Sequence, residues 1–273
     1  MDADVFLSKH PVFTREDWLK SLAGSDSVRT KETKLHYYVK KGRAVRVRQG
    51  LYVSVPPGDD PATVHPDPFL VCAKAAADSV VAYHAAMELH GRAYSLHQRF
   101  DFQTSTDVRS FAFRGVSYRA RTFPVRLMDL EETHCEVEEQ ERSGLTVRVT
   151  TLERTLVDAL DRPELAGGWE EIWRSMGSVE YYDGKRIVNY LKLLGNATTV
   201  AKTGYFLEKH LDALPFGAGV LDELAAMRPQ QPRRMDRQRR DDDVFAPRWN
   251  LIVPRQVAEQ SWEEPVQRVV LSS

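Results

Sequence analysis

Residues 40–52 have the sequence KKGRAVRVRQGLY, and this stretch decides the fold predicted for the N-terminal part of the chain. Gly42 stands where a residue in the left-handed region ends many helices. Residues 44–48 then alternate apolar and basic side chains, which is the period of a half-buried strand. Gln49-Gly50 predicts a tight turn, and residues 51–55 predict the returning strand. The stretch therefore predicts a helix end followed by a β-hairpin.

Two helices are predicted upstream of this hairpin. Thr14 is a good N-cap residue, and Asp17 stands three positions later with the spacing of a capping box. A turn follows at 24–27, and a second helix is expected from about residue 30 to 41, with Leu35 on its inward side. A helix that fits a major groove and a basic hairpin that reaches the flanking phosphates form the layout of a winged helix-turn-helix.

Positive charge is concentrated in the same region. The whole chain has a net charge of −1, so affinity for nucleic acid has to come from such local clustering. Between residues 29 and 48, eight basic residues stand against one acidic residue, Glu32. A solvated basic face is the plainer interpretation, and winged helices also serve as protein docking modules. The order of helix, glycine, basic strand and turn favours a DNA-binding surface.

The spacing of the basic residues predicts how they contact DNA. Lys31, Lys34 and Lys41 are expected close to one face of the helix. Arg46 and Arg48 are expected on one side of the strand, where both would reach phosphates. Side chains of the helix would enter the groove. The predicted DNA-binding residues are Lys31, Thr33, Lys34, Tyr37, Lys40, Lys41, Arg43, Arg46 and Arg48.

The rest of the chain predicts an α+β protein with two domains. A linker rich in Pro and Asp separates a winged helix-turn-helix domain at 1–58 from a mixed α/β C-terminal domain at 68–273 that ends in a helical region. Helices are expected at 68–77 and 82–90, strands within 100–150, helices over 151–227, a mobile loop at 228–246 and a last strand at 248–253.

Residues with catalytic potential do not form a convincing site in the sequence. Glu153 and Asp158 are five residues apart on a predicted helix, so they do not share a tight common face. Arg154 and Asp158 are instead expected to form an i, i+4 ion pair in a core helix. Gly167-Gly168 lacks the ending of a phosphate-binding loop and predicts a turn. No catalytic residue is therefore assigned.

Metal and cofactor sites are not predicted either. His84 and His90 are six residues apart, which does not suit a helical zinc pair. His134-Cys135 lies among glutamates, in a segment expected to be a solvated acidic loop. An enzymatic alternative, a nuclease or nucleotidyltransferase with a DNA-targeting domain, would need metal ligands such as Asp101 and Asp107, and no triad can be built from them. The expectation is a protein that is not an enzyme.

The sequence predicts a cytoplasmic protein. The N-terminus is acidic and lacks the pattern of a signal peptide, and no stretch approaches 18 apolar residues, so no membrane is expected. The two cysteines, Cys72 and Cys135, are far apart in the sequence and give no disulfide framework.

Several segments resemble the AbiEi-type antitoxin family. They are 13–17, 40–52, 80–91 with its His-Gly ending, 151–161 followed by Gly167-Gly168, 195–197 and 203–208, and they lie within residues 10–215. The chain differs from the family at His84-Ala85-Ala86, where members often have Ser, and at Lys202-Thr203-Gly204-Tyr205, where members often have Arg-Leu-Gly-Tyr.

The resemblance implies a function. AbiEi-type proteins are antitoxins of bacterial type IV toxin–antitoxin systems that act in abortive infection, a phage defence. The family binds the promoter of its own operon through the winged helix and represses transcription. Its toxin has a nucleotidyltransferase fold, and the C-terminal domain is tied to countering that toxin. The expected partners are therefore double-stranded operator DNA and a cognate nucleotidyltransferase-like toxin, with no cofactor. A transcriptional regulator unrelated to a toxin is the second alternative.

Overall fold

The chain folds into two compact units of mixed helix and strand, as the α+β prediction requires. The computed structural model describes residues 2–21, 27–211, 215–217 and 219–262. The first unit comprises residues 1–91 and 96–151, and the second comprises 92–95 and 152–273. The segment predicted as a winged helix lies in the first unit together with a six-stranded sheet.

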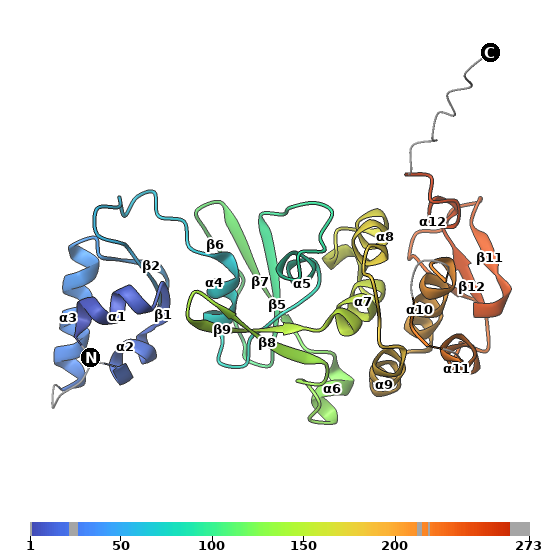
Figure 1. Cartoon of the computed structure of the whole chain (residues 1–273), viewed down its shortest axis with the longest axis horizontal. Helices are drawn as coiled ribbons and strands as arrows, with labels where there is room; N and C mark the ends of the chain where they lie inside the picture. Colours follow the sequence, from blue (N-terminus) through green and yellow to red (C-terminus); the bar gives the residue numbers. More distant parts are fainter. Residues whose placement is uncertain (1, 22–26, 212–214, 218, 263–273) are drawn as a thin grey trace, which may run out of the picture. The chain divides into compact units, whose positions relative to one another are not determined.

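The N-terminal part of the first unit has the order helix, strand, two helices and a hairpin (Figure 1). Its strands form a sheet in the order β1-β3-β2. Trp18 is fully buried among aromatic rings, with Phe6 edge-on at 5.3 Å between ring centroids, and these rings form most of the local core. The elements are α1 (Ala3–Lys9), β1 (Val12–Thr14), α2 (Arg15–Ser21), α3 (Val28–Lys40), β2 (Ala44–Arg48) and β3 (Leu51–Ser54).

The rest of the first unit is built around a sheet with the strand order β6-β7-β5-β4-β9-β8. α4 packs against β4, β5 and β9 (Figure 1), and Phe100 and Phe102 of β5 lie in the core beneath it. The elements are α4 (Pro68–Ala75), β4 (Val80–Val81), α5 (His84–Leu89), β5 (Arg99–Thr104), β6 (Phe111–Phe113), β7 (Val116–Thr122), α6 (Val125–Asp129), β8 (Val137–Arg142) and β9 (Leu145–Thr150). The strands predicted within 100–150 are thus confirmed.

One prediction in this sheet is partly wrong. The acidic segment is a loop around His134-Cys135, as predicted, but Glu138 and Glu139 belong to β8, an edge strand paired with β9 over six residues. Ser143 and Gly144 both have positive φ, 50° and 74°, as a tight hairpin turn between these strands requires. Acidic residues are depleted in strands, so local propensity does not predict a strand here. The strand is defined by its pairing with β9.

The second unit is mainly helical. Arg154 and Asp158 are buried in α7 and form the predicted i, i+4 ion pair, with Nε and Oδ2 3.4 Å apart. Gly167 and Gly168 form the predicted turn before α8, both at positive φ. The elements are α7 (Leu152–Asp161), η1 (Pro163–Leu165), α8 (Trp169–Gly177), α9 (Gly184–Leu194), α10 (Ala197–Lys209), α11 (Val220–Ala226), β10 (Arg233–Arg234), β11 (Val244–Ala246), η2 (Pro247–Trp249), β12 (Leu251–Val253) and α12 (Arg255–Ala258).

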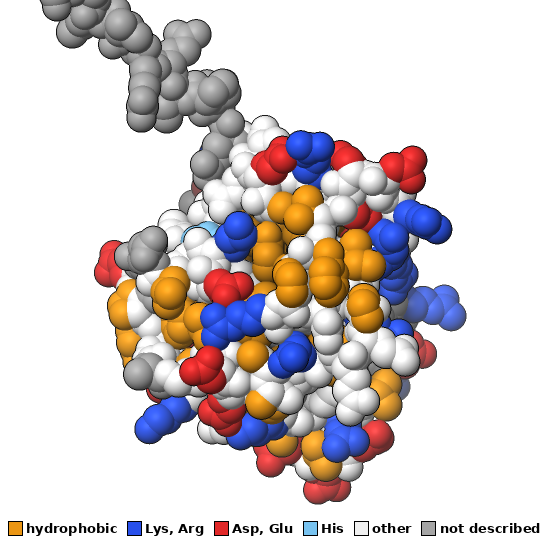
Figure 2. All heavy atoms as spheres, turned by 90° about the vertical axis from the view of Figure 1, so that its right-hand side faces the viewer, with side chains coloured by type: hydrophobic (Ala, Val, Ile, Leu, Met, Phe, Trp, Pro, Cys, Tyr) orange, Lys and Arg blue, Asp and Glu red, His pale blue; other side chains and the backbone are white. Residues whose placement is uncertain are grey.

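The segment expected as a loop at 228–246 contains two short strands, β10 and β11, which flank β12 in a three-stranded sheet. An ion pair between Arg234 and Asp243 ties its two ends together. Figure 2 looks onto this end of the unit and shows hydrophobic side chains among charged ones. β11 contributes the exposed Val244 and Phe245. Within the described residues, no helix is long and apolar enough to span a membrane.

Candidate nucleic-acid interface

The ends of α3 determine which of its side chains face solvent. Ser27 caps its N-terminus, because the Ser27 hydroxyl accepts a hydrogen bond of 3.2 Å from the Thr30 amide. At the other end Gly42 has φ +71°, and its amide donates to the Val39 carbonyl, as predicted for the residue that ends the helix. Leu35 is buried and fixes the inward face. The opposite face is therefore exposed along the length of the helix.

This exposed face is cationic. Its only neighbouring acid on the helix, Glu32, is half-buried and is paired with Arg15 of α2. Tyr37 is 56% exposed, and the Lys41 ammonium lies 5.7 Å from the centre of its ring. The exposed polar and aromatic side chains of the helix and its C-cap are Arg29, Thr30, Thr33, Lys34, His36, Tyr37, Lys40 and Lys41. Five of the predicted residues, Thr33, Lys34, Tyr37, Lys40 and Lys41, thus lie on one surface.

Lys31 is not on that surface, so its predicted place beside Lys34 and Lys41 is wrong. Its side chain turns inward, and Nζ donates to the Leu19 carbonyl of α2 over 2.9 Å. Its own carbonyl accepts the indole hydrogen bond of Trp18 at 2.8 Å. Lys31 precedes the buried Leu35 by one helical turn, which places both on the inward side. Lys31 therefore joins the two helices.

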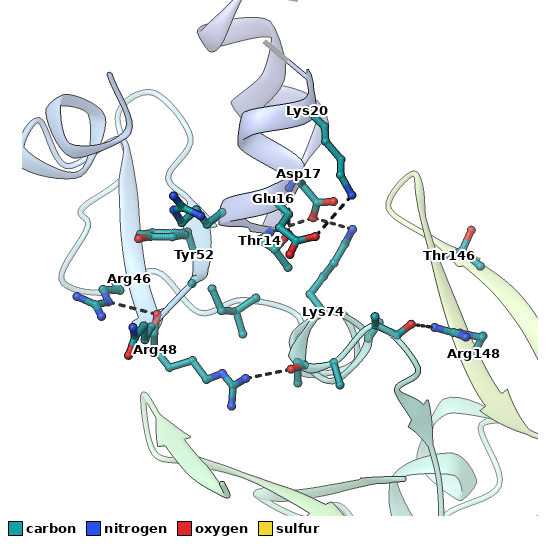
Figure 3. A pocket seen from close by; sticks show the side chains of 18 of the residues that line it. Thr14, Glu16, Asp17, Lys20, Arg46, Arg48, Tyr52, Lys74, Thr146 and Arg148 are labelled. Carbon is teal, nitrogen blue, oxygen red and sulfur yellow. Dashed lines mark hydrogen bonds and ion pairs between the residues drawn. The ribbon is translucent and has the colours of Figure 1, made fainter. Parts of the chain in front are cut away.

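Arg46 and Arg48 do not share one side of their strand, contrary to the prediction. The β2–β3 register shifts between them, so Arg46 faces Tyr52 while Arg48 faces Leu51. Such a bulge breaks the alternation of side chains. Figure 3 shows the two side chains pointing in different directions, with Arg46 exposed.

Arg48 turns toward the six-stranded sheet. Its Nη2 donates to the Ala75 carbonyl over 3.0 Å, and its guanidinium lies 5.0 Å from the centre of the Phe111 ring. Burial lowers the pKa of the Arg48 guanidinium from its ordinary value. Arg48 therefore contacts α4 and β6, and it fixes the hairpin against the rest of the first unit.

Arg43 is directed toward α1. Its Nη1 lies 3.4 Å from Oδ1 of Asp4, and its Nε donates to the Val55 carbonyl, also over 3.4 Å. The side chain is only partly exposed. Of the nine predicted residues, Lys31, Arg43 and Arg48 thus have contacts inside the first unit, whereas the other six are exposed.

A polar cleft of about 910 Å³ lies beside α3 (Figure 3). Its first wall consists of the start of α2, His36 of α3 and the β2–β3 hairpin. Its second wall consists of the C-terminal end of α4 with Glu139, Thr146 and Arg148 of the β8–β9 hairpin. The cationic side chains that line it are Arg15, Lys20, Arg46, Arg48, Lys74 and Arg148. The first wall and the exposed face of α3 are continuous through His36.

The predicted capping box closes one side of this cleft. The Thr14 amide donates to Asp17 Oδ2 at 2.9 Å, and the Asp17 amide donates to the Thr14 hydroxyl at 3.0 Å. Lys74 of α4 adds an ion pair to Asp17 at 2.9 Å. Burial alone would raise the pKa of Asp17, but the hydrogen bond from Thr14 and the charge of Lys74 outweigh it, so the pKa is lowered. The carboxylate of Asp17 is therefore neutralised locally.

Sequence reasoning missed Arg29 and His36 as members of the exposed face. At 100° per residue, Arg29, Lys40 and Thr33 lie about 120°, about 140° and about 160° around the helix from the buried Leu35. His36 lies at the edge of the same arc and lines the cleft. A helical wheel centred on Leu35 would have found both residues. The pattern of charge along the sequence, taken alone, predicts Lys31 as a member of that face instead.

The carboxylates considered for an enzyme do not come together. Asp101 is buried, and its two oxygens accept from Arg99 at 2.8 Å and from Arg121 at 2.6 Å. Asp107 is exposed in the loop after β5. Across the described ranges, no group of three or more His, Cys, Asp or Glu side chains is arranged to hold a metal ion. The Asp101 carboxylate therefore forms ion pairs with two arginines of the six-stranded sheet.

Comparison with known proteins concerns the fold. No protein-family model matches the chain, and no curated protein matches it. Among solved structures, the chain is similar to the crystal structure of the RV2827C protein from Mycobacterium tuberculosis, with a TM-score of 0.59 and 17% sequence identity. The match covers 93% of this chain and 90% of that chain. The two proteins therefore share a fold over nearly their full lengths.

Proposed function

We propose that this protein binds double-stranded DNA through α3 and the β2–β3 hairpin, and that it represses its own operon. One observation carries the proposal: the exposed face of α3 presents Arg29, Lys34, Lys40 and Lys41, while the acid of this helix, Glu32, is paired with Arg15. The order α1-β1-α2-α3-β2-β3 and the sheet order β1-β3-β2 match those expected of a winged helix, which supports the proposal. In that fold the second helix of the pair enters the major groove.

The residues divide into two roles under this proposal. Thr33 and Tyr37 lie nearest the middle of the exposed arc, where they meet base edges in a groove. The exposed cationic side chains meet phosphates, which set affinity and register; they are Arg29, Lys34, Lys40, Lys41 and Arg46. Lys31, Arg43 and Arg48 support the surface from within. The site proposed for DNA is therefore smaller than the nine residues expected from the sequence and gains Arg29 and His36.

The test is a fluorescence anisotropy titration with a duplex from the region upstream of the gene, over a series of salt concentrations. We expect salt-sensitive binding, because each phosphate contact releases counterions. Lys40→Ala should weaken binding to all duplexes and reduce the slope of log K against log[salt] by about 1. Lys31→Ala is the matched control, since it removes the same charge from the inward side. It should lower the thermal midpoint and leave the salt slope unchanged. Equal effects of the two variants on DNA binding, or no binding by the unsubstituted protein, would refute the proposal.

The antitoxin role rests on the resemblance of segments 40–52 and 151–161 to the AbiEi-type family, and we propose it together with DNA binding. The partner is then a toxin with a nucleotidyltransferase fold, encoded next to this chain. Expression of the adjacent product should arrest growth, and co-expression of this protein should restore it. Intact DNA binding without rescue would leave a transcriptional regulator that has no toxin partner. If the Lys40→Ala variant still restores growth, the effect on the toxin does not depend on DNA binding.

A further inference from the structure

Three arginines of the cleft beside α3 donate hydrogen bonds to backbone carbonyls. Arg46 Nε donates to the Arg48 carbonyl at 3.3 Å, and Arg48 Nη2 donates to the Ala75 carbonyl at 3.0 Å. Arg148 Nη2 donates to the Ala77 carbonyl within the second wall, and Figure 3 shows these three bonds. A carbonyl oxygen fixes a guanidinium without cancelling its charge, whereas a carboxylate would cancel it. The hydrogen bonds therefore orient three positive charges around the cleft and preserve those charges.

The acidic residues of the cleft do not offset these arginines fully. Asp17 is taken by Thr14 and Lys74, and Glu16 pairs with Lys20 at 3.5 Å. Glu139 faces Arg148 across the β8–β9 ladder and is the one acid left beside the three arginines, among the cleft residues that the structure describes. The net charge of the side chains that line the cleft is therefore positive, and both walls contribute cationic side chains. A phosphate-bearing ligand matches this chemistry, because guanidinium groups bind phosphate through paired N–H donors.

We propose that this cleft receives the sugar-phosphate backbone of the DNA duplex bound by α3, so that Thr146 and Arg148 of the six-stranded sheet are part of the DNA interface. The inference rests on the proposed function. DNA is the assigned ligand because His36 belongs both to the cleft lining and to the exposed face of α3, and α3 packs against β2, which carries Arg46. A backbone that leaves that face would meet the cleft next. Lys74–Asp17 and Arg48–Ala75 join the two walls, so the second wall is held beside the first.

The interface would then be longer than a winged helix alone provides. Arg148 lies 102 positions after Arg46 in the sequence, and no local pattern links the two. A duplex that spans both walls gains phosphate contacts beyond the segment that α3 covers, and these contacts add to affinity without adding to base recognition. The sheet thus extends the protected length of DNA on one flank of the site.

Two variants on the second wall test the proposal in the full-length protein. Arg148→Ala removes the charge, and Thr146→Glu adds a negative charge at an exposed position without removing the bond to Ala77. We expect each variant to weaken binding about fivefold or more at moderate salt, and Arg148→Ala to lower the salt slope by about 1. Hydroxyl-radical footprinting should show loss of protection on one flank only. The matched controls are Arg119→Ala and Thr122→Glu, exposed positions on β7 outside the cleft, which should change neither readout.

The possible results separate this inference from the proposed function. If the unsubstituted protein binds the duplex and Lys40→Ala weakens it, while the second-wall variants keep the affinity and the footprint, then the cleft does not bind the backbone. If the unsubstituted protein does not bind DNA, the proposed function fails and the inference with it. A free nucleotide is the other source of phosphate. ATP that binds the protein in the absence of DNA and loses affinity in both second-wall variants, with DNA binding unchanged, would also overturn the assignment to DNA.

Discussion

Arg46 and Arg48 are two residues apart on one strand and have the same side chain, yet they occupy different environments. The register shift between them leaves Arg46 exposed and turns Arg48 toward the Ala75 carbonyl and the Phe111 ring. The alternation rule applies to a regular ladder, and a bulge suspends it. A bulge depends on how two strands pair, so it cannot be predicted from the sequence of β2 alone. At the scale of the residue, the sequence therefore predicts which positions carry positive charge, but it does not predict which way each charged side chain points.

Asp17 offers a pH-dependent test at the same scale. Its pKa is lowered in the folded protein, so its contribution to stability is complete above the unfolded-state pKa of about 3.8 and is lost as the pH falls through the lower folded-state pKa. Asp17→Asn should lower the free energy of unfolding by about 1 kcal/mol at pH 7, the usual value of a cap. The difference from the unsubstituted protein should vanish as the pH falls below 3.8.

Urea unfolding at pH 7, 5 and 3 gives the measurement for Asp17. Glu16→Gln is the control, because Glu16 is the next residue and its side chain is 76% exposed. It should have little effect at any of the three pH values, since exposed ion pairs contribute little. A difference between the Asp17 variant and the unsubstituted protein that persists undiminished at pH 3 would contradict the assignment.

At the scale of the element, the sequence predicted most of what is local. The capping box of α2, the end of α3 at Gly42 and the strands from β5 to β7 follow from caps, turns and alternation, and the structure confirms them. β8 was missed because its stability comes from pairing with β9 and not from its own residues. The exposed face of α3 was predicted in part: the helix was right, but Lys31 was assigned to the wrong side because its inward contact involves α2.

The position of Gly204 on α10 leads to a prediction about how α10 packs against η2. A Cβ at this position would overlap the indole ring of Trp249, which follows from the close approach of η2 to α10. Alanine normally stabilises a helix interior by about 1 kcal/mol relative to glycine. Gly204→Ala should instead destabilise the protein by about 1–3 kcal/mol, because overpacking displaces the ring. The sign of the change in the urea midpoint decides between the two effects.

A double-mutant cycle isolates the contact with Trp249. In a Trp249→Leu background the ring is absent, so Gly204→Ala should become neutral or stabilising. Trp249 also donates its indole hydrogen bond to Glu208 at 2.7 Å, so its substitution alone lowers stability and serves as the reference for the cycle. Additive effects of the two substitutions would mean that Gly204 is required for another reason.

At the scale of the whole molecule, the chain enters the second unit twice. Residues 92–95 belong to it although they lie between segments of the first unit, and the chain returns to it at Leu152. The carboxylate of Glu171 on α8 holds this short segment: Oε1 accepts from the Tyr94 amide at 2.9 Å and Oε2 from the Ser95 hydroxyl at 2.6 Å. Such a crossing joins positions about 76 residues apart, as the Ser95–Glu171 contact shows, and no periodic pattern in the sequence reveals it.

Glu171→Gln tests whether this carboxylate ties the crossing segment to the second unit. The amide replaces one acceptor oxygen with a donor, which leaves a part-buried N–H or hydroxyl without this partner, at a cost of about 1 kcal/mol. We expect faster hydrogen exchange at the Tyr94 and Ser95 amides and a lower unfolding midpoint for the second unit. Glu164→Gln, an exposed position in η1, should change neither. The residues proposed for DNA binding all lie in the first unit, so the affinity for the duplex should stay within about twofold of the unsubstituted protein, less than the loss of one phosphate contact. Unchanged exchange at Tyr94 and Ser95 would show that other contacts hold the segment, and a large loss of DNA affinity would show that the two units are coupled.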